Sequence, residues 1–251
     1  MKQANSASEY IGVLGRKVTP GQLTGKKVAV VRMPGVSDEA FNGINEQLKI
    51  AAGTIVNSVT IKDSWFSEEL LSYRDTLAST LAGKLADKVD AKVSSQQVLA
   101  TALGMGLTSA DKEIQALVSN LSAGDTPLIS KETLTDPAQM ILVLSPISSE
   151  KDTKAGGSQI DLDFVKGIDG ALPKGTVIVG SAKNETDYLT KIRAEKLEVT
   201  TVDGIGSVMS NTSIPFALLA DESGNNQAYG NEHYASQLIP PFPDAEKEEN
   251  K

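Results

Sequence analysis

Side chains able to do chemistry are few in this sequence. There is one histidine, His233, and no cysteine, which excludes thiol nucleophiles, disulfides and thiolate metal ligands. Cu(I) prefers thiolate and thioether ligands, and Cu(II) prefers imidazole. The methionines form no close M-x-x-M pair, and Met33 and Met140 stand in apolar runs, where methionine commonly fills a core. We therefore expect no intrinsic high-affinity copper site, no other metal site and no cofactor.

Hydroxyl and carboxyl groups offer little more for catalysis. Ser145-Pro146 and Gly180-Ser181 follow two apolar runs, at the sheet edge where α/β enzymes place their sites, but neither forms a G-x-S-x-G elbow. Asp161 and Asp163 form a D-x-D pair before a helix, where acidic side chains more simply interact with the helix dipole than with a metal. A histidine-dependent triad has only His233 to recruit, so we expect no enzyme.

Nucleotide and nucleic-acid binding have weak support. The run Arg32–Gly35 (RMPG) is not G-x-G-x-x-G, and Pro34 lacks the backbone donor that a phosphate cradle needs. The run Asp203–Ser207 (DGIGS) contains a lone G-x-G, which a tight turn and a Ser207 N-cap explain. The formal charge of −8 argues against nucleic acid and against an anionic membrane surface as direct partners.

Aromatic residues are the candidates for binding a partner. Trp65 and Phe66 follow an apolar run, and either anchor an interface or close the core beneath a helix. Tyr229, His233 and Tyr234 lie in a segment rich in Asn and Gly, and are either exposed anchors or residues that attach the tail to the body. The sequence leaves both pairs of alternatives open.

Apolar runs that alternate with helical patterns must position these residues. Continuous apolar runs indicate strands covered on both faces of a sheet, and Ser37-Asp38-Glu39 predicts a helix start. The pattern predicts an α/β fold: a Rossmann-like, doubly wound, mostly parallel sheet of about five strands. The expected strands are 28–33, 54–61, 140–144, 176–180 and 199–202, and the expected helices outside the middle of the chain are 6–14, 37–51, 160–168, 186–196 and 207–220.

The middle of the chain predicts a helical insertion. Between residues 64 and 125, four segments carry apolar residues at helical spacing: 68–77, 81–89, 95–103 and 109–121. The sheet pattern then resumes, with a polar loop at 148–157. We expect one α/β domain over 26–240 that contains this insertion, and a disordered acidic tail over 241–251.

Three stretches resemble the SteB/MctB family of actinobacterial septation factors, which is also described as a copper transporter family. The first is LTGKKVAVVRMPGVSDEAFNGINEQLKIAAGTIVNSVTIKDSWFSEE at 23–69, similar to the family's opening strand, helix and strand. The second is GTVIVGSAKN at 175–184, and the third is VTTVDGIGSVMSNTSIPFALLADESGNNQAYG at 199–230. Their order and spacing cover nearly the whole chain, although no single motif is as specific as a zinc signature.

The resemblance implies a membrane anchor. Family members have a short cytoplasmic start, one transmembrane helix, a coiled coil and then this domain on the extracytoplasmic, periplasmic side of the plasma membrane. It follows that residues 1–25 are a lead that comes after a removed transmembrane helix and coiled coil, and that the coiled coil holds two copies as a homodimer. The membrane would then be contacted only through the missing helix.

The resemblance also implies a role in cell division. Its expected partners are a SteA-like membrane protein and the coiled-coil segment of a peptidoglycan endopeptidase, a septal hydrolase that this domain would activate. One alternative is a copper-efflux or copper-binding envelope protein, although the sequence offers few copper ligands. The other is a degenerate α/β domain that binds a small ligand.

Overall fold

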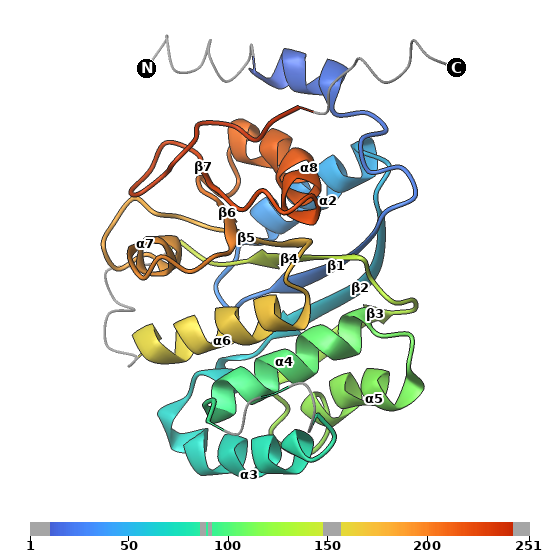
Figure 1. Ribbon diagram of the computed structural model, residues 1–251, viewed down its shortest axis with the longest axis vertical. Coiled ribbons are helices and arrows are strands. Elements are labelled where there is room, and N and C mark those ends of the chain that lie inside the picture. Colours follow the sequence, from blue (N-terminus) through green and yellow to red (C-terminus); the bar gives the residue numbers. More distant parts are fainter. Residues whose placement is uncertain (1–10, 86–88, 90–91, 148–156, 243–251) are drawn as a thin grey trace.

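The computed structural model describes residues 11–85, 89, 92–147 and 157–242. One mixed sheet of seven strands crosses the molecule, and helices cover both of its faces (Figure 1). The strand order is β3-β2-β1-β4-β5-β6-β7, and neighbouring strands are parallel except for β2 and β3, which are antiparallel. The strands are β1 (Lys27–Arg32), β2 (Thr54–Ile61), β3 (Ile129–Leu134), β4 (Met140–Leu144), β5 (Thr176–Val179), β6 (Thr200–Val202) and β7 (Ala228–Tyr229).

The first strand, helix and strand form as their sequence predicts. Helix α2 (Asp38–Ile50) begins after Ser37, whose hydroxyl accepts a hydrogen bond from the amide of Ala40 at 3.2 Å. Its apolar face buries Ile44 and Leu48 against the sheet, and β1 and β2 pair in parallel. Local capping and one apolar face are sufficient signals here, because both act within a few residues.

Side chains of the strands alternate between two cores. Ala29, Val31 and Val143 face one core with α3 to α7, and Val28, Val30 and Leu142 face the other with α2 and α8. Met33 lies in the first core and Met140 in the second, where their thioethers are buried. The helices that follow α2 are α3 (Leu71–Ala82), α4 (Ser95–Thr108), α5 (Lys112–Leu121), α6 (Gly157–Ala171), α7 (Tyr188–Ala194) and α8 (Val208–Glu222).

One predicted break in the helical middle is wrong. Where a break was expected between segments 68–77 and 81–89, the single helix α3 continues from Leu71 to Ala82. A short 3₁₀ turn, Glu68–Leu70, leads into α3, and another, Asp63–Trp65, comes before it. Ser79 and Thr80 do not interrupt this helix, because their hydroxyls donate to the carbonyls of Asp75 and Thr76 one turn earlier. Residues 86–88 and 90–91, within the predicted second segment, lie outside the described residues.

The sequence predicts about five strands, and the sheet has two more, β3 and β7. Strand β3 is an exposed edge whose central residues are polar, and β7 has only two residues. Both depend on pairing with distant strands, which no local pattern records. The α/β class and the mostly parallel sheet are confirmed, and the finer assignment to a Rossmann-like doubly wound fold stays a prediction.

The two ends of the described chain meet at one end of the molecule. A helix covers 11–18, of which the prediction of 6–14 included the first part, and it lies over α8 together with the C-terminal segment (Figure 1). In the described part of the chain, no helix combines the length and the hydropathy that crossing a bilayer requires. The polar loop predicted at 148–157 and most of the predicted tail fall outside the described residues.

Candidate functional site

The aromatic residues singled out by the sequence fall into buried and exposed sets. Trp65 is fully buried, and its ring meets the edge of Phe164 with centroids 5.4 Å apart. Phe66 is half-buried and tilts against the same Phe164 ring at 6.3 Å. A partner has no access to Trp65, so the placement of this pair favours closure of the core beneath α6 over an interface anchor.

Tyr229 is also fully buried. It occupies β7 and packs in the core shared with α2 and α8. Burial, and to a smaller extent the nearby Asp221 carboxylate, raises the pKa of its phenol. Tyr229 therefore attaches the C-terminal segment to the body of the molecule and presents nothing to solvent.

His233 and Tyr234 are exposed. The side chain of Tyr234 is 64% accessible, and its backbone has a φ of +58°, which is a rare conformation for a bulky residue. The imidazole Nδ1 of His233 lies 2.7 Å from the carbonyl oxygen of Ala182, so the ring is held by that contact. These two residues keep the role of exposed anchors open.

A buried ion pair fixes the loop that carries them. Arg193 and Asp203 pair at 2.9 Å, with side chains only 3% and 0% exposed. The Asp203 carboxylate also accepts from the amides of Asn231 and Glu232, and Arg193 donates to the carbonyl of His233. Burial lowers the pKa of Arg193, and the hydrogen bond that its guanidinium donates to Asp203 opposes this shift. We call Arg193 and Asp203 the loop latch.

Gly230 is required where the loop leaves β7. Its φ is +128°, and a Cβ at this position would lie 2.0 Å from an Asp203 carboxylate oxygen. Only glycine lets the chain pass so close to the latch. The Asp203–Ser207 run is visible in the sequence, but the latch is not, because Arg193 lies on a different element.

The residues weighed as catalytic or ligand-binding have structural partners. The hydroxyl of Ser181 donates to Asp187 at 2.7 Å, and the hydroxyl of Ser145 donates to the carbonyl of Val179; both serines are buried. Gly204 has a φ of +72°, and the Ser207 hydroxyl accepts from the amide of Ser210. The lone G-x-G is thus a tight turn followed by an N-cap.

Metal-ligating side chains do not gather in the described part of the chain. No group of three His, Cys, Asp or Glu residues comes together among those residues. Of the D-x-D pair, Asp163 accepts from the Ser94 hydroxyl at 2.6 Å and lies 3.7 Å from the Lys166 amine. The side chain of Asp161 is not among those described.

Exposed apolar side chains concentrate near the two termini. Of the eleven large apolar side chains that are exposed in the described part of the chain, seven lie on the helix at 11–18, at the start of α8 or in the C-terminal segment. We call this set the terminal face: Val13, Leu14, Val18, Val208, Leu238, Ile239 and Phe242.

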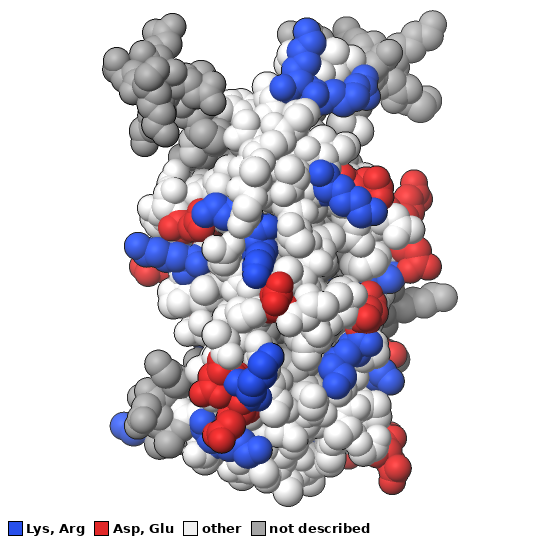
Figure 2. Space-filling model, turned by 90° about the vertical axis from the view of Figure 1, so that its right-hand side faces the viewer, with Lys and Arg blue, Asp and Glu red and all other residues white. Residues whose placement is uncertain are grey.

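Contacts across the terminal face tie its parts together. A Cβ at Gly12 would lie 3.5 Å from Val208, and Phe242 stacks edge-on against Phe216 of α8 at 4.7 Å. The helix at 11–18 also exposes Arg16 and Lys17, and Figure 2 shows a group of basic side chains at this end, with no acidic side chain beside it among the described residues in view. The face is therefore apolar and locally cationic on a chain whose net charge is −8.

Comparison with known protein families finds a match over most of the chain. The family model described as copper transport outer membrane protein, MctB, matches residues 1–240. A search of curated proteins finds no significant match to the chain.

Proposed function

The chain belongs to the MctB family, and from this premise we propose that it is a non-enzymatic protein-interaction domain of a membrane-anchored cell-division factor. In this proposal the domain lies on the extracytoplasmic side of the plasma membrane. It acts with a SteA-like membrane protein to activate a septal peptidoglycan hydrolase. The anchor is a transmembrane helix and a coiled coil that precede residues 1–25.

The terminal face is the observation that carries this proposal. Patches of exposed apolar residues on a soluble domain mark interaction sites, because leaving them in water costs free energy. The cationic Arg16 and Lys17 beside Leu14 suit a partner helix that combines apolar and acidic residues.

A homodimer would form through the helix at 11–18, in the same region. Ile11, Leu14 and Val18 follow one another at spacings of three and four residues, as a coiled-coil seam requires. A coiled coil entering this helix would join two copies at their terminal faces, and would leave the C-terminal part of each face for the partner.

The mechanism we favour is a shift of populations. A hydrolase that is autoinhibited by its own coiled-coil segment becomes active when this domain binds that segment, because binding stabilises the open state. The domain needs no catalytic residue for this task.

Titration calorimetry of the chain against the coiled-coil segment of a septal endopeptidase tests the proposal. We expect a Kd of about 1 μM or tighter. Leu238→Gln combined with Ile239→Gln should weaken binding at least about tenfold, since both side chains are exposed on the C-terminal part of the terminal face. Leu71→Gln is the matched control, because Leu71 is 50% exposed on α3, remote from this face. Equal losses in both variants, or no binding by the wild-type chain, contradict the proposal.

Copper handling is the second candidate, and the description of the family favours it. The exposed ring of His233 is the imidazole that Cu(II) would select. Titration of Cu(I) and Cu(II) into the chain, with His233→Ala in parallel, tests this role. Saturable binding that is lost in the variant supports a copper site, and the absence of copper heat leaves the interaction role.

A further inference from the structure

A proline-rich segment closes the described part of the chain and lies over α8 (Figure 1). Residues 238–242 have the sequence LIPPF, and Pro243 follows them, so the chain has the spacing P-x-x-P at 240–243. We call residues 238–242 the strap. Its exposed apolar side chains, Leu238, Ile239 and Phe242, are three of the seven that define the terminal face.

Covalent chemistry restricts the backbone of the strap. Proline locks its own φ at about −65° and disfavours a helical conformation in the residue that precedes it. Pro240 and Pro241 are locked in this way, and Ile239, Pro240 and Phe242 each precede a proline. The chain bends at Leu238 and Ile239 and then runs through 240–242 without a helix, turn or bend. These restrictions favour the polyproline II conformation over 240–242.

The body of the molecule covers one edge of the strap and leaves two edges free. A polyproline II helix has about three residues per turn, so three consecutive side chains point in three directions. Pro240 is buried, Pro241 is exposed and Phe242 is 50% exposed. Phe242 meets Phe216 of α8 edge-on, with centroids 4.7 Å apart. A binding partner can therefore reach Pro241 and Phe242 without displacing Pro240.

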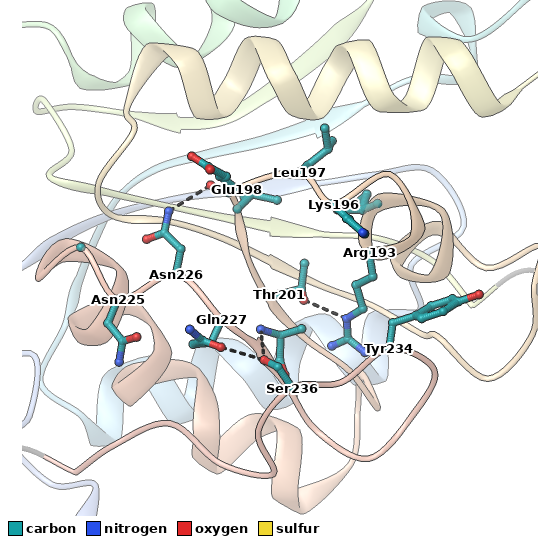
Figure 3. Close-up of a pocket in the computed structure, with 14 residues that line it drawn as sticks. Arg193, Lys196, Leu197, Glu198, Thr201, Asn225, Asn226, Gln227, Tyr234 and Ser236 are labelled. Atoms are coloured by element: carbon teal, nitrogen blue, oxygen red, sulfur yellow. Dashed lines mark hydrogen bonds between the residues drawn. The ribbon is translucent and has the colours of Figure 1, made fainter.

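The start of the strap is fixed to the sheet. The amide of Gln237 donates to the carbonyl of Ala228 at 3.1 Å, and the carbonyl of Gln237 accepts from the amide of Gly230 at 2.8 Å. The Ser236 hydroxyl donates to Gln227 Oε1 at 2.8 Å, and Figure 3 shows this bond beside the cleft that these residues line. A strap that is ordered before binding avoids part of the entropic cost of association.

The backbone of the strap is available to a partner. Within the part of the chain that the structure describes, residues 238–242 make no backbone hydrogen bond. Pro240 and Pro241 have no N–H, so a partner strand cannot pair with the strap as it would with a sheet edge. Carbonyl oxygens and side chains remain as the groups that a partner can recognise.

We propose that the strap is a ligand for a folded partner domain whose groove is lined by aromatic side chains. Such grooves bind P-x-x-P segments in the polyproline II conformation. Pro241 and Phe242 pack between the rings of the groove, and indole N–H or phenol O–H groups donate to the carbonyl oxygens of the strap. This partner differs from the hydrolase helix of the proposed function, and the two would compete, because the strap is part of the terminal face.

NMR titration of three ¹⁵N-labelled probe domains with the whole chain tests the inference. The probes are an SH3, a WW and an EVH1 domain, each of which carries an aromatic-lined groove. We expect shifts in the groove of at least one probe, with a Kd of about 1 mM or tighter.

Two double variants of the chain locate the binding surface. Pro241→Ala combined with Phe242→Gln should weaken binding at least about tenfold, because both exposed edges of the strap lose their side chains. Pro173→Ala combined with Leu71→Gln is the matched control. It makes the same kinds of change at exposed residues outside the terminal face, and should bind as the wild type does.

Three outcomes would overturn the inference. They are unchanged spectra of all three probes, shifts that lie outside the aromatic groove, and equal losses in the two double variants. Binding of the endopeptidase segment with no binding of any probe would overturn this inference alone. Binding of a probe to the strap with no binding of the endopeptidase segment would instead contradict the proposed hydrolase role alone.

Discussion

At the scale of single residues, burial decides which side chains can act. Trp65 and Tyr229 are enclosed, whereas Tyr234 projects from the loop that the latch holds. The same physical quantity governs the charged residues, because a buried charge must be paired or must change its protonation state.

Removing one member of the loop latch should destabilise the fold strongly. Asp203→Ala leaves the Arg193 charge buried without its partner, and we expect a loss of about 3–5 kcal/mol in the free energy of unfolding. Urea denaturation measures this. Glu46→Ala is the control, because Glu46 forms an exposed pair with Lys49, and it should cost no more than about 0.5 kcal/mol. A latch variant as stable as this control would contradict the assignment.

Asp169 should make stability fall as the pH rises. Burial, with smaller contributions from Asp221 and Glu198, raises the pKa of Asp169 to about 7. The folded state therefore retains a proton that the unfolded state loses above a pH of about 4. Stability is highest below that pH and declines until the folded state also releases the proton, near pH 7.

Asp169→Asn removes this dependence and measures its size. Urea denaturation at each pH gives the free energy of unfolding of the variant minus that of the wild type. This difference should be larger at pH 8 than at pH 4 by on the order of 1–3 kcal/mol. The gain at high pH arises because the variant has no carboxylate to desolvate. If the substitution changes the free energy of unfolding equally at pH 4 and pH 8, the pKa of Asp169 is not raised by folding.

At the scale of elements, α4 and α6 approach each other through small residues. Gly167 of α6 faces α4 so closely that a Cβ would lie 2.5 Å from the carbonyl oxygen of Gln97 and 2.6 Å from the Cβ of Ala100. A methyl group here must push the two backbones apart. This close approach lets α4 and α6 share the core beneath the sheet.

Gly167→Ala should therefore cost about 1–3 kcal/mol of stability. Gly170→Ala on the same helix meets nothing within 4 Å, and should instead stabilise by about 0.4–1 kcal/mol by restricting the unfolded chain. Thermal or urea unfolding of both variants compares the two directly. A stabilising Gly167→Ala would mean that the helices separate more easily than their packing implies.

At the scale of the whole molecule, the exposed apolar area is distributed unevenly, because both described ends of the chain lie over α8. Leu14→Gln with Leu238→Gln should shorten retention on a hydrophobic-interaction column more than Leu71→Gln with Ile147→Gln does. All four side chains are exposed, so both variants should retain stability within about 0.5 kcal/mol of the wild type. Equal retention times would show that the terminal face is not a contiguous apolar surface.

The sequence by itself determined the elements whose signals are local. The apolar runs of β1, β2, β4 and β5, and the Ser37 and Ser207 caps, lie where the sequence places them, because burial on both faces and capping each leave a pattern within a few residues. The family resemblance is also confirmed by the match over residues 1–240.

Only the tertiary structure decided which residues are reachable. It paired β3 and β7 with distant strands, buried Trp65 and Tyr229, and brought Arg193 to Asp203 from another element. It also assembled the terminal face from segments far apart in the chain. Such features depend on contacts between distant segments, and the free energy of those contacts leaves no periodic or local pattern in the sequence from which they could be predicted.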